Sequence, residues 1–461
     1  MPEVSGGRPS SAGRLGRAGV AVTVAGFVVN GFGYVVPVLG ARQLSAGDLG
    51  ALAAVLALGA VAAVPALGLQ TALAVRWAKD GQVRNAGRLA LATTALTVGI
   101  LVAATPLITA LLHISALPSL LLAATIAAVI VASRWLGQLQ GAQRFGQLAV
   151  GMVLLAVARY GGVIAGLAAG AGVTGSLAVG AVVAWLTLPV LALLASRAEP
   201  ASNSTRGDAA SSGATSSPAA TARPDGRVRL AGRDIFAASG ATLAMLAISY
   251  ADLILARYLL PPADAGAYAV GAVLTKGALW APQVVTILAL PRLAQGSRRA
   301  LIYALAVVAA CDAVLVAAAF LAGDLAIWLA GGPGYAGISG YAPGFAAVGA
   351  LYALVFVLVN AEIAARARFP AAPLWVALAG LATVALLWDP PSLGRLLTIS
   401  VTTAALTTLA MGAVVARTAV RARTTADFAK SASAATPAVS ASDHGQQGSG
   451  HPGHDRAAGG A

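Results

Sequence analysis

Twelve long apolar stretches, separated by short polar and basic segments, constrain the fold of this sequence more than any other feature. A helix that crosses the hydrocarbon core of a bilayer needs about 20 predominantly apolar residues. Of the 461 residues, 58% are hydrophobic and only 10% are charged, so a water-soluble fold would expose large apolar areas. The sequence therefore predicts an all-α integral membrane protein. The spans are expected at residues 19–40, 49–74, 88–111, 116–137, 147–170, 175–196, 235–257, 265–290, 300–323, 342–364, 371–388 and 396–417.

The distribution of Lys and Arg tests the number of spans, because a missed or invented helix would mix the two sides of the membrane. With the N-terminus in the cytoplasm, 25 of the 30 basic residues lie on the cytoplasmic side. Arg42, Arg257 and Arg395 lie on the outer side, and Arg159 and Lys276 lie within spans. The pattern therefore predicts a multi-pass protein with both termini in the cytoplasm.

Polar segments divide the chain into two groups of six spans. A stretch rich in Ser, Ala, Thr and Pro joins the two groups, and a similar stretch follows the last span. Segments of this composition bury too little apolar surface to fold. We therefore expect a cytoplasmic N-terminal tail at 1–18, an N-terminal six-helix lobe at 19–196, a disordered cytoplasmic linker at 197–234, a C-terminal six-helix lobe at 235–417 and a disordered cytoplasmic tail at 418–461.

The sequence offers little for a metal, a cofactor or nucleic acid. The single cysteine, Cys311, lies in an apolar run and excludes an intrachain disulfide. His444, His451 and His454 lie in the polar tail, where solvated side chains are expected. The basic residues form short clusters rather than a continuous face, which argues against nucleic acid as a partner. We expect no metal site and no cofactor.

Two short sequences, one after the first span and one after the seventh, match each other. The first reads Ala41-Arg42-Gln43-Leu44, followed by Gly47-Asp48-Leu49-Gly50. The second reads Ala256-Arg257-Tyr258-Leu259, followed by Ala263-Asp264-Ala265-Gly266. Because each half has an even number of spans, both halves enter the membrane from the same side and form parallel repeats. This arrangement predicts a cleft between two six-helix lobes.

The first of these sequences belongs to a longer pattern that resembles a known family. A glycine-rich helix precedes it, and Pro65-Ala66-Leu67-Gly68-Leu69-Gln70 follows it. The pattern resembles polysaccharide biosynthesis proteins of the Wzx type, which are lipid-linked oligosaccharide flippases of the multidrug/oligosaccharidyl-lipid/polysaccharide (MOP) exporter superfamily. The resemblance is most specific over residues 16–80 and returns at 245–290. It implies two parallel lobes of the MOP/MATE-like fold.

The same resemblance implies a function, a location and partners. It implies a transporter in the bacterial plasma membrane that flips a polyprenyl-diphosphate-linked oligosaccharide to the outer leaflet by alternating access between the lobes. The implied partners are the lipid-linked glycan, membrane lipid and other polysaccharide assembly proteins.

Ionisable residues inside spans are candidates for the site, because a charge at the bilayer centre costs about 2.5 to 3.5 kcal/mol on insertion scales. Arg159 and Lys276, one in each half, suit the two phosphates of a diphosphate. Asn30, in the glycine-rich first span, and Tyr160, whose ring can stack on a sugar, complete the candidate substrate site.

Two acidic residues within spans are candidates for ion coupling. Asp252 and Asp312 could take up H⁺ or coordinate Na⁺, and the sequence contains no phosphate-binding loop for ATP. The alternative is structural, in which Arg159 pairs with Asp312 or Lys276 pairs with Asp252 as an ion pair.

Other functions remain open at this stage. A twelve-helix multidrug or other small-solute exporter shares the layout, although the loop Trp77-Ala78-Lys79-Asp80-Gly81-Gln82-Val83-Arg84 lacks the motif typical of the major facilitator group. A polysaccharide polymerase would be an enzyme. The absence of long outer loops, paired carboxylates and a nucleotide-phosphate loop argues against an enzyme.

Overall fold

The computed structural model describes residues 11–80, 83, 85–196, 232–280, 298–365, 367, 369–388 and 390–434, and the regular structure within these residues is helical throughout. The N-terminal half contains α1 (Ser11–Gln43), α2 (Ala46–Ala62), α3 (Val64–Asp80), α4 (Ala86–Leu112), α5 (Ala116–Gly141), α6 (Phe145–Ala156), the π-helical turn η1 (Val157–Gly161), α7 (Gly162–Ala168) and α8 (Gly172–Ser196). The C-terminal half contains α9 (Gly232–Leu259), α10 (Pro262–Trp280), α12 (Arg298–Leu321), α13 (Gly323–Gly331), the 3₁₀ helix η2 (Pro333–Tyr341), α14 (Ala342–Ala364), α15 (Ala372–Leu387) and α16 (Leu393–Ala434).

The helices agree with the predicted spans. Among the described residues, ten helical segments are long and apolar enough to cross a membrane, and they coincide with ten of the twelve expected spans. The remaining two spans, the eighth and the eleventh, correspond to α10 and to the 16-residue α15. At 1.5 Å per residue α15 is about 24 Å long, which is slightly shorter than the hydrocarbon core. The expectation of an all-α, multi-pass membrane protein is confirmed.

One predicted span is broken by a proline. The expected helix 49–74 is divided into α2 and α3, with a break at Ala63. Pro65 explains the break, because its ring clashes with the carbonyl four residues earlier and it has no N–H to donate. The Ala66 amide instead bonds the Ala63 carbonyl at 3.0 Å.

Two other segments differ from expectation. The sequence predicts a loop from Gly323 to Tyr341, but the structure folds this stretch as α13 followed by η2. α16 continues to Ala434, into the segment for which we expect a disordered tail. Residues 413–434 contain neither Gly nor Pro, so no residue there breaks the helix. The linker at 197–231 and the tail at 435–461 lie outside the described residues.

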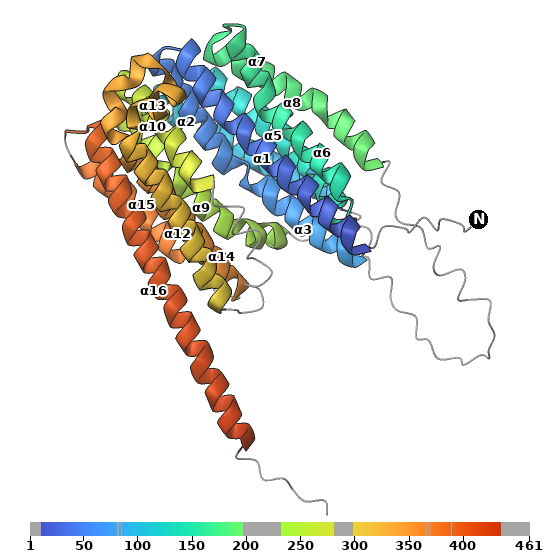
Figure 1. Cartoon of the computed structure of the whole chain (residues 1–461). Helices are drawn as coiled ribbons and strands as arrows, with labels where there is room; N and C mark the ends of the chain where they lie inside the picture. Colours follow the sequence, from blue (N-terminus) through green and yellow to red (C-terminus); the bar gives the residue numbers. More distant parts are fainter. Residues whose placement is uncertain are drawn as a thin grey trace, which may run out of the picture. The chain divides into compact units, whose positions relative to one another are not determined.

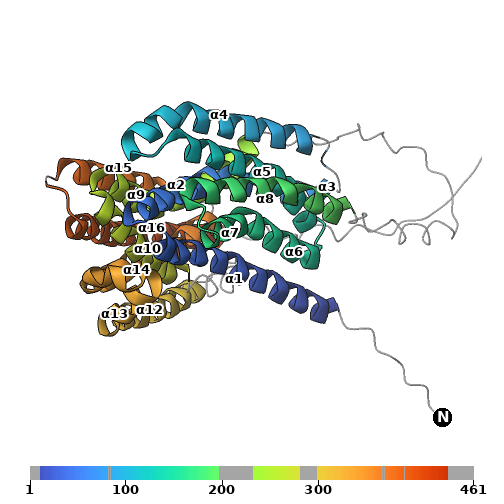
Figure 2. The same cartoon turned by 90° about the horizontal axis from the view of Figure 1, so that it is seen from above.

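The described residues up to Gly412 form one compact unit, and those from Ala413 onward form a second. Within the first unit, Figures 1 and 2 show the helices of the N-terminal half, in blue to green, beside those of the C-terminal half, in yellow to red. The two halves meet where α2 packs on α10 and where α2 and α3 pack on α9. We call the end of this unit that contains Ala41–Gly50 and Ala256–Gly266 the repeat end.

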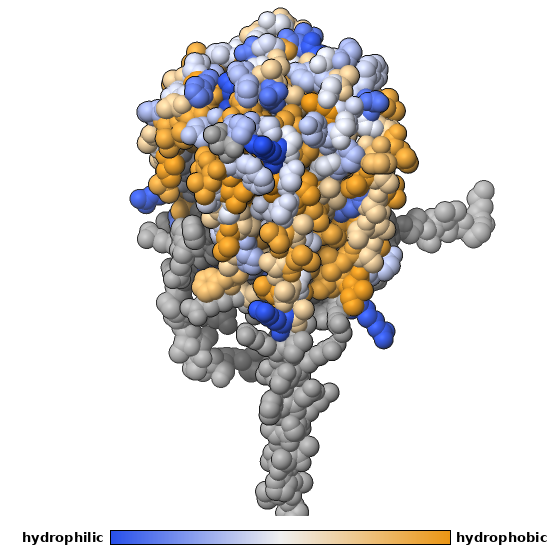
Figure 3. Space-filling model, turned by 90° about the vertical axis from the view of Figure 1, so that its left-hand side faces the viewer, coloured by the Kyte–Doolittle hydropathy of each residue, from blue (hydrophilic) through white to orange (hydrophobic). Residues whose placement is uncertain are grey.

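Packing inside the N-terminal half is dense, whereas its outer helices expose apolar side chains. Leu52, Leu69 and Ile130 are buried in its core, together with many alanines that allow close approach of the helices. In contrast, Leu96 on α4 and Leu186 on α8 are each 67% exposed. Apolar residues also cover much of the face shown in Figure 3. Lipid, rather than water, is the solvent that suits such a surface.

Candidate functional site

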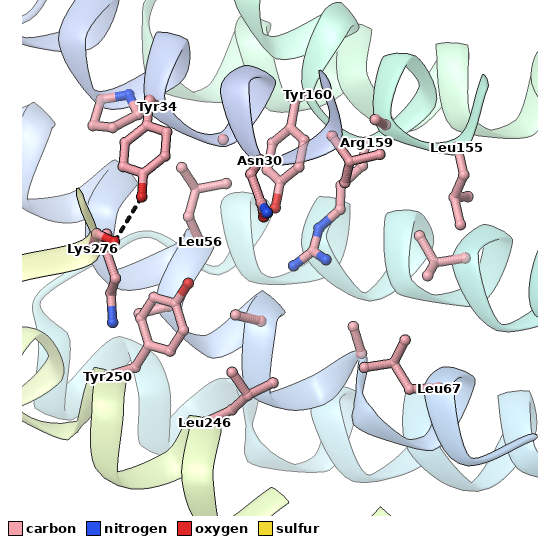
Figure 4. A pocket seen from close by; sticks show the side chains of 18 of the residues that line it. Asn30, Tyr34, Leu56, Leu67, Leu155, Arg159, Tyr160, Leu246, Tyr250 and Lys276 are labelled. Atoms are coloured by element: carbon pink, nitrogen blue, oxygen red, sulfur yellow. Dashed lines mark hydrogen bonds between the residues drawn. The ribbon is translucent and has the colours of Figure 1, made fainter. Parts of the chain in front are cut away.

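A cavity of about 420 Å³ lies between the two halves, lined by α1, α2, α3, α5, α6, α9, α10 and η1. Most of its wall is apolar. The exceptions are a few polar side chains that come from both halves: Asn30, Tyr34, Gln70, Ser133, Arg159, Tyr160, Tyr250 and Lys276. Figure 4 shows several of these side chains directed into the cavity. A mostly apolar wall with a few convergent polar groups is typical of ligand sites.

Arg159 enters the cavity from the π-helical turn η1, which separates α6 from α7. Single π turns inside α-helices occur frequently at functional sites, because the extra residue changes which side chains face a given direction. The Arg159 guanidinium carbon lies 5.1 Å from the centroid of the neighbouring Tyr160 ring. No hydrogen-bond acceptor for the guanidinium is found among the described residues. Its donors are therefore directed toward the space that a ligand would occupy.

Lys276 reaches the cavity from α10 and is fixed by contacts with α1 and α9. Its ammonium donates a hydrogen bond to the Ser249 carbonyl and lies 3.5 Å from the centroid of the Tyr250 ring. Such a position over an aromatic face stabilises a cation. The Tyr34 hydroxyl donates to the Lys276 carbonyl at 2.6 Å, which ties α1 to α10 (Figure 4). Because an ammonium has three donors, the Ser249 bond leaves two for a ligand.

The structure brings together all four residues predicted to bind substrate. Asn30, Arg159, Tyr160 and Lys276 all line the one cavity, although they come from distant parts of the sequence. Tyr34 and Tyr250 also line the cavity but were not predicted from the sequence as site residues. The sequence offered one signal for them: the whole chain has only nine tyrosines, so a tyrosine within an aliphatic span is unusual and indicates a candidate site residue.

Asp252 does not line the cavity but lies in a buried polar cluster of the C-terminal half. It is 3% exposed. The Tyr268 hydroxyl donates to its Oδ2 at 3.0 Å, and the Leu253 amide donates to its Oδ1 at 2.8 Å. The Tyr268 hydroxyl is also 3.4 Å from Ser400 Oγ. No salt bridge joins Asp252 to Lys276 within the described structure, so the predicted ion pair is not formed.

Asp312 lies apart from both the cavity and the Asp252 cluster. It is on α12 and 3% exposed, and neither of its carboxylate oxygens has a hydrogen-bond partner among the described residues. Within the described structure, Asp312 also forms no salt bridge with Arg159. The two predicted coupling acids therefore occupy separate sites. In the segments that the structure describes, no group of three His, Cys, Asp or Glu side chains is placed to bind a metal ion.

Comparison with solved structures identifies the fold. An outward-facing multidrug resistance MATE family transporter of the MOP superfamily matches with a TM-score of 0.57 and 14% identity, over 88% of this chain and 96% of that chain. An inward-facing one matches with a TM-score of 0.55 and 11% identity, over 84% and 94%. The eukaryotic MATE transporter AtDTX14 matches with a TM-score of 0.54 and 16% identity, over 89% and 98%. No protein-family model and no curated protein sequence matches the chain.

The chain therefore shares the fold of these MATE family transporters. This result confirms the MOP/MATE-like fold expected from the sequence. At these identities the comparison defines the fold alone, and the Wzx-type assignment stays a prediction. The TM-scores against the outward-facing and inward-facing structures are nearly equal, so these scores do not assign either conformation to this chain.

Proposed function

We propose that the protein flips a polyprenyl-diphosphate-linked oligosaccharide from the inner to the outer leaflet of the plasma membrane for polysaccharide biosynthesis or export. The observation that carries this proposal is the presence of two cations from opposite halves, Arg159 and Lys276, in one cavity. In a bilayer such charges are costly unless they serve a ligand or a partner. The proposal includes both termini in the cytoplasm, with the repeat end on the outer side.

Four polar groups of the cavity have a role in this proposal. Arg159 offers a planar fork that can bind two oxygens of a phosphate, and Lys276 offers a compact charge for the second phosphate. Tyr160 and Asn30 suit a sugar, because a ring face stacks on its apolar side and an amide bonds its hydroxyls. A 420 Å³ cavity is within the range of sites for drug-sized ligands, so it suits the diphosphate and the sugar next to it, while the long lipid tail stays in the bilayer.

We further propose that an ion gradient drives the cycle and that Asp252 or Asp312 carries the ion. Asp252 is the stronger candidate. Its buried carboxylate accepts a hydrogen bond from the Tyr268 hydroxyl, which in turn lies 3.4 Å from Ser400 Oγ, and such oxygen groups suit H⁺ or Na⁺. Asp312 is the second candidate, because a buried carboxylate with no hydrogen bond in the described structure suits a group that is protonated for part of the cycle.

Export of a drug-like solute is the second candidate function, and the mostly apolar wall of the cavity favours it. The structures that this fold matches include multidrug resistance MATE family transporters. However, two cations in the cavity would repel a cationic drug, since like charges in a low-dielectric site interact strongly. An anionic or amphiphilic substrate fits this cavity better.

The test is a strain that lacks the protein, analysed for lipid-linked sugar intermediates. We expect these intermediates to accumulate, and we expect Arg159→Ala to fail to restore export while its level in the membrane stays normal. Arg159→Lys should restore export only in part, because an ammonium cannot bind two oxygens in a planar fork.

The matched control is Arg88→Ala, which removes an exposed arginine outside the cavity and should restore export fully. Sensitivity to drugs without accumulated lipid-linked sugar would contradict the flippase and support the exporter. Loss of the Arg159→Ala protein from the membrane would indicate that this residue is needed for folding instead.

A further inference from the structure

The repeated Ala-Arg sequences, which have no part in the cavity, join the two halves at the repeat end. Arg257, at the end of α9, donates three hydrogen bonds to the N-terminal half. Its Nε bonds the Leu112 carbonyl at 2.9 Å, its Nη1 bonds the Gly47 carbonyl at 3.2 Å, and its Nη2 bonds the His113 carbonyl at 3.2 Å. A single side chain thus holds the end of α4 and the start of α2.

The repeat-related Arg42 makes the reciprocal contact. It lies at the end of α1, and its Nη2 donates to the Leu329 carbonyl of α13 in the C-terminal half at 3.4 Å. Leu112 and Leu329 both lie in the last turn of a helix, where carbonyl groups lack partners within the helix and the helix dipole is negative. A guanidinium is well suited to this position. The internal repeat therefore provides one arginine from each half, directed at a helix end of the other.

A close crossing of α2 and α10 lies at the same end. Gly50 and Gly266 occupy equivalent positions of the repeat. A Cβ atom at Gly266 would lie 2.1 Å from the Ala46 carbonyl oxygen, and one at Gly50 would lie 3.2 Å from the Gly266 nitrogen. The backbones of the two halves are therefore in direct contact, and a side chain at Gly266 would push them apart.

These contacts lie between the cavity and the repeat end of the unit. Toward this end, the cavity wall stops at Pro37 on α1, Ala53 on α2, Leu253 on α9 and Ala269 on α10. The described residues beyond those positions on these four helices do not line the cavity. A ligand could leave through the repeat end only if the arginine contacts and the glycine crossing separated.

We propose that Arg42 and Arg257 form a two-part latch that holds the repeat end shut and that must release for the cavity to open there. The sidedness of the latch rests on the proposed function, which places the repeat end outside. Arg257, with three bonds, is the stronger part, and Arg42, with one, is the weaker.

The test measures how often the cavity opens to the outside. Cys311, the only cysteine, is replaced by serine, and Ala60 in the cavity wall is replaced by cysteine. The rate of labelling by a membrane-impermeant thiol reagent is then measured in right-side-out and in inverted vesicles, without substrate. We expect Arg257→Ala to raise the labelling rate in right-side-out vesicles by about tenfold, because one charge-assisted hydrogen bond already shifts a two-state equilibrium by about that factor.

The variants are chosen to separate the latch from a general loss of structure. Arg42→Ala should raise the rate less than Arg257→Ala, and Gly266→Ala should raise it as well. Arg395→Ala is the matched control: Arg395 is the third arginine predicted on the outer side, but its Nη1 bonds the Pro390 carbonyl of its own half at 2.7 Å. Its labelling rate should not change.

Two other outcomes would overturn either the latch or its sidedness. Unchanged labelling from both sides in Arg42→Ala and Gly266→Ala, with normal protein level, would overturn the latch even if Arg257→Ala did not fold. An increase that occurs only in inverted vesicles would support the latch and overturn the proposed sidedness. Because no substrate is present, failure of the flippase proposal would leave these results unaffected.

Discussion

Arg159 and Lys276 carry their charges under different constraints. The Arg159 guanidinium has no acceptor among the described residues, whereas the Lys276 ammonium bonds the Ser249 carbonyl and lies against the Tyr250 ring. The first cation is available to bind, and the second is positioned by its neighbours. A ligand that contacted both cations would therefore bind a guanidinium that is free to adjust and an ammonium whose position is fixed. Tyr250 therefore determines where the second contact lies.

Substitution of Tyr250 tests this positioning. Tyr250→Leu removes the aromatic face, which is worth about 0.5 to 2 kcal/mol for a nearby cation. We expect the half-saturating concentration of lipid-linked substrate to rise by several-fold in reconstituted vesicles. Tyr250→Phe keeps the face and is the matched control, so it should behave like the unmodified protein. Equal effects of the two substitutions would contradict a role for the ring.

At the scale of the helices, the site depends on local departures from a regular α-helix. η1 turns Arg159 into the cavity, and the break before Pro65 lets α2 and α3 line it at different angles. α7 is held in place after η1, because a Cβ atom on Gly162 would lie 2.6 Å from the Gly180 Cα on α8. The direction of Arg159 therefore depends on the extra residue of the π turn.

Deletion of Gly161 removes this extra residue and tests its role. The turn should become α-helical with one residue fewer, so α6 and α7 should keep their relative orientation while the Arg159 side chain within the turn changes direction. We expect helical content, measured by circular dichroism, to stay unchanged while substrate binding is lost. Restoration of one residue, by insertion of alanine at the same place, should restore binding. Retained binding in the deletion variant would show that the π turn is dispensable.

The sequence predicted spans more accurately than it predicted their interruptions. The span 342–364 coincides with α14, because runs of apolar residues determine where a chain crosses lipid. The π turn was not predicted, since the insertion of one residue leaves an all-apolar pattern unchanged. Arg159 and Lys276 were predicted because charge in lipid is costly, whereas Tyr34 and Tyr250 were missed because tyrosine is ordinary near membrane surfaces.

At the scale of the whole molecule, the internal repeat accounts for the position of the cavity and for its closure. The parallel halves form the cavity between them, and the repeated Arg and Gly positions join the halves beyond it. The two candidate coupling acids both belong to the C-terminal half, whereas Arg159 belongs to the N-terminal half. An ion bound in one half can therefore influence a substrate bound between both, provided that the ion changes how the halves pack.

Conservative replacement of Asp252 tests this coupling. Asp252→Asn keeps the shape of the side chain but removes its charge, so the group can no longer take up H⁺ or bind Na⁺ strongly beside Tyr268. Translocation of lipid-linked substrate is measured in reconstituted vesicles with and without an imposed H⁺ or Na⁺ gradient, and substrate binding is measured separately. We expect gradient-driven translocation to be lost while binding is retained, because the cavity wall does not include Asp252. Asp312→Asn is the parallel variant, and loss of gradient-driven transport in it alone would assign the ion to α12. If binding falls as much as transport in Asp252→Asn, the carboxylate instead holds Lys276 in position through charge, and the coupling role is contradicted.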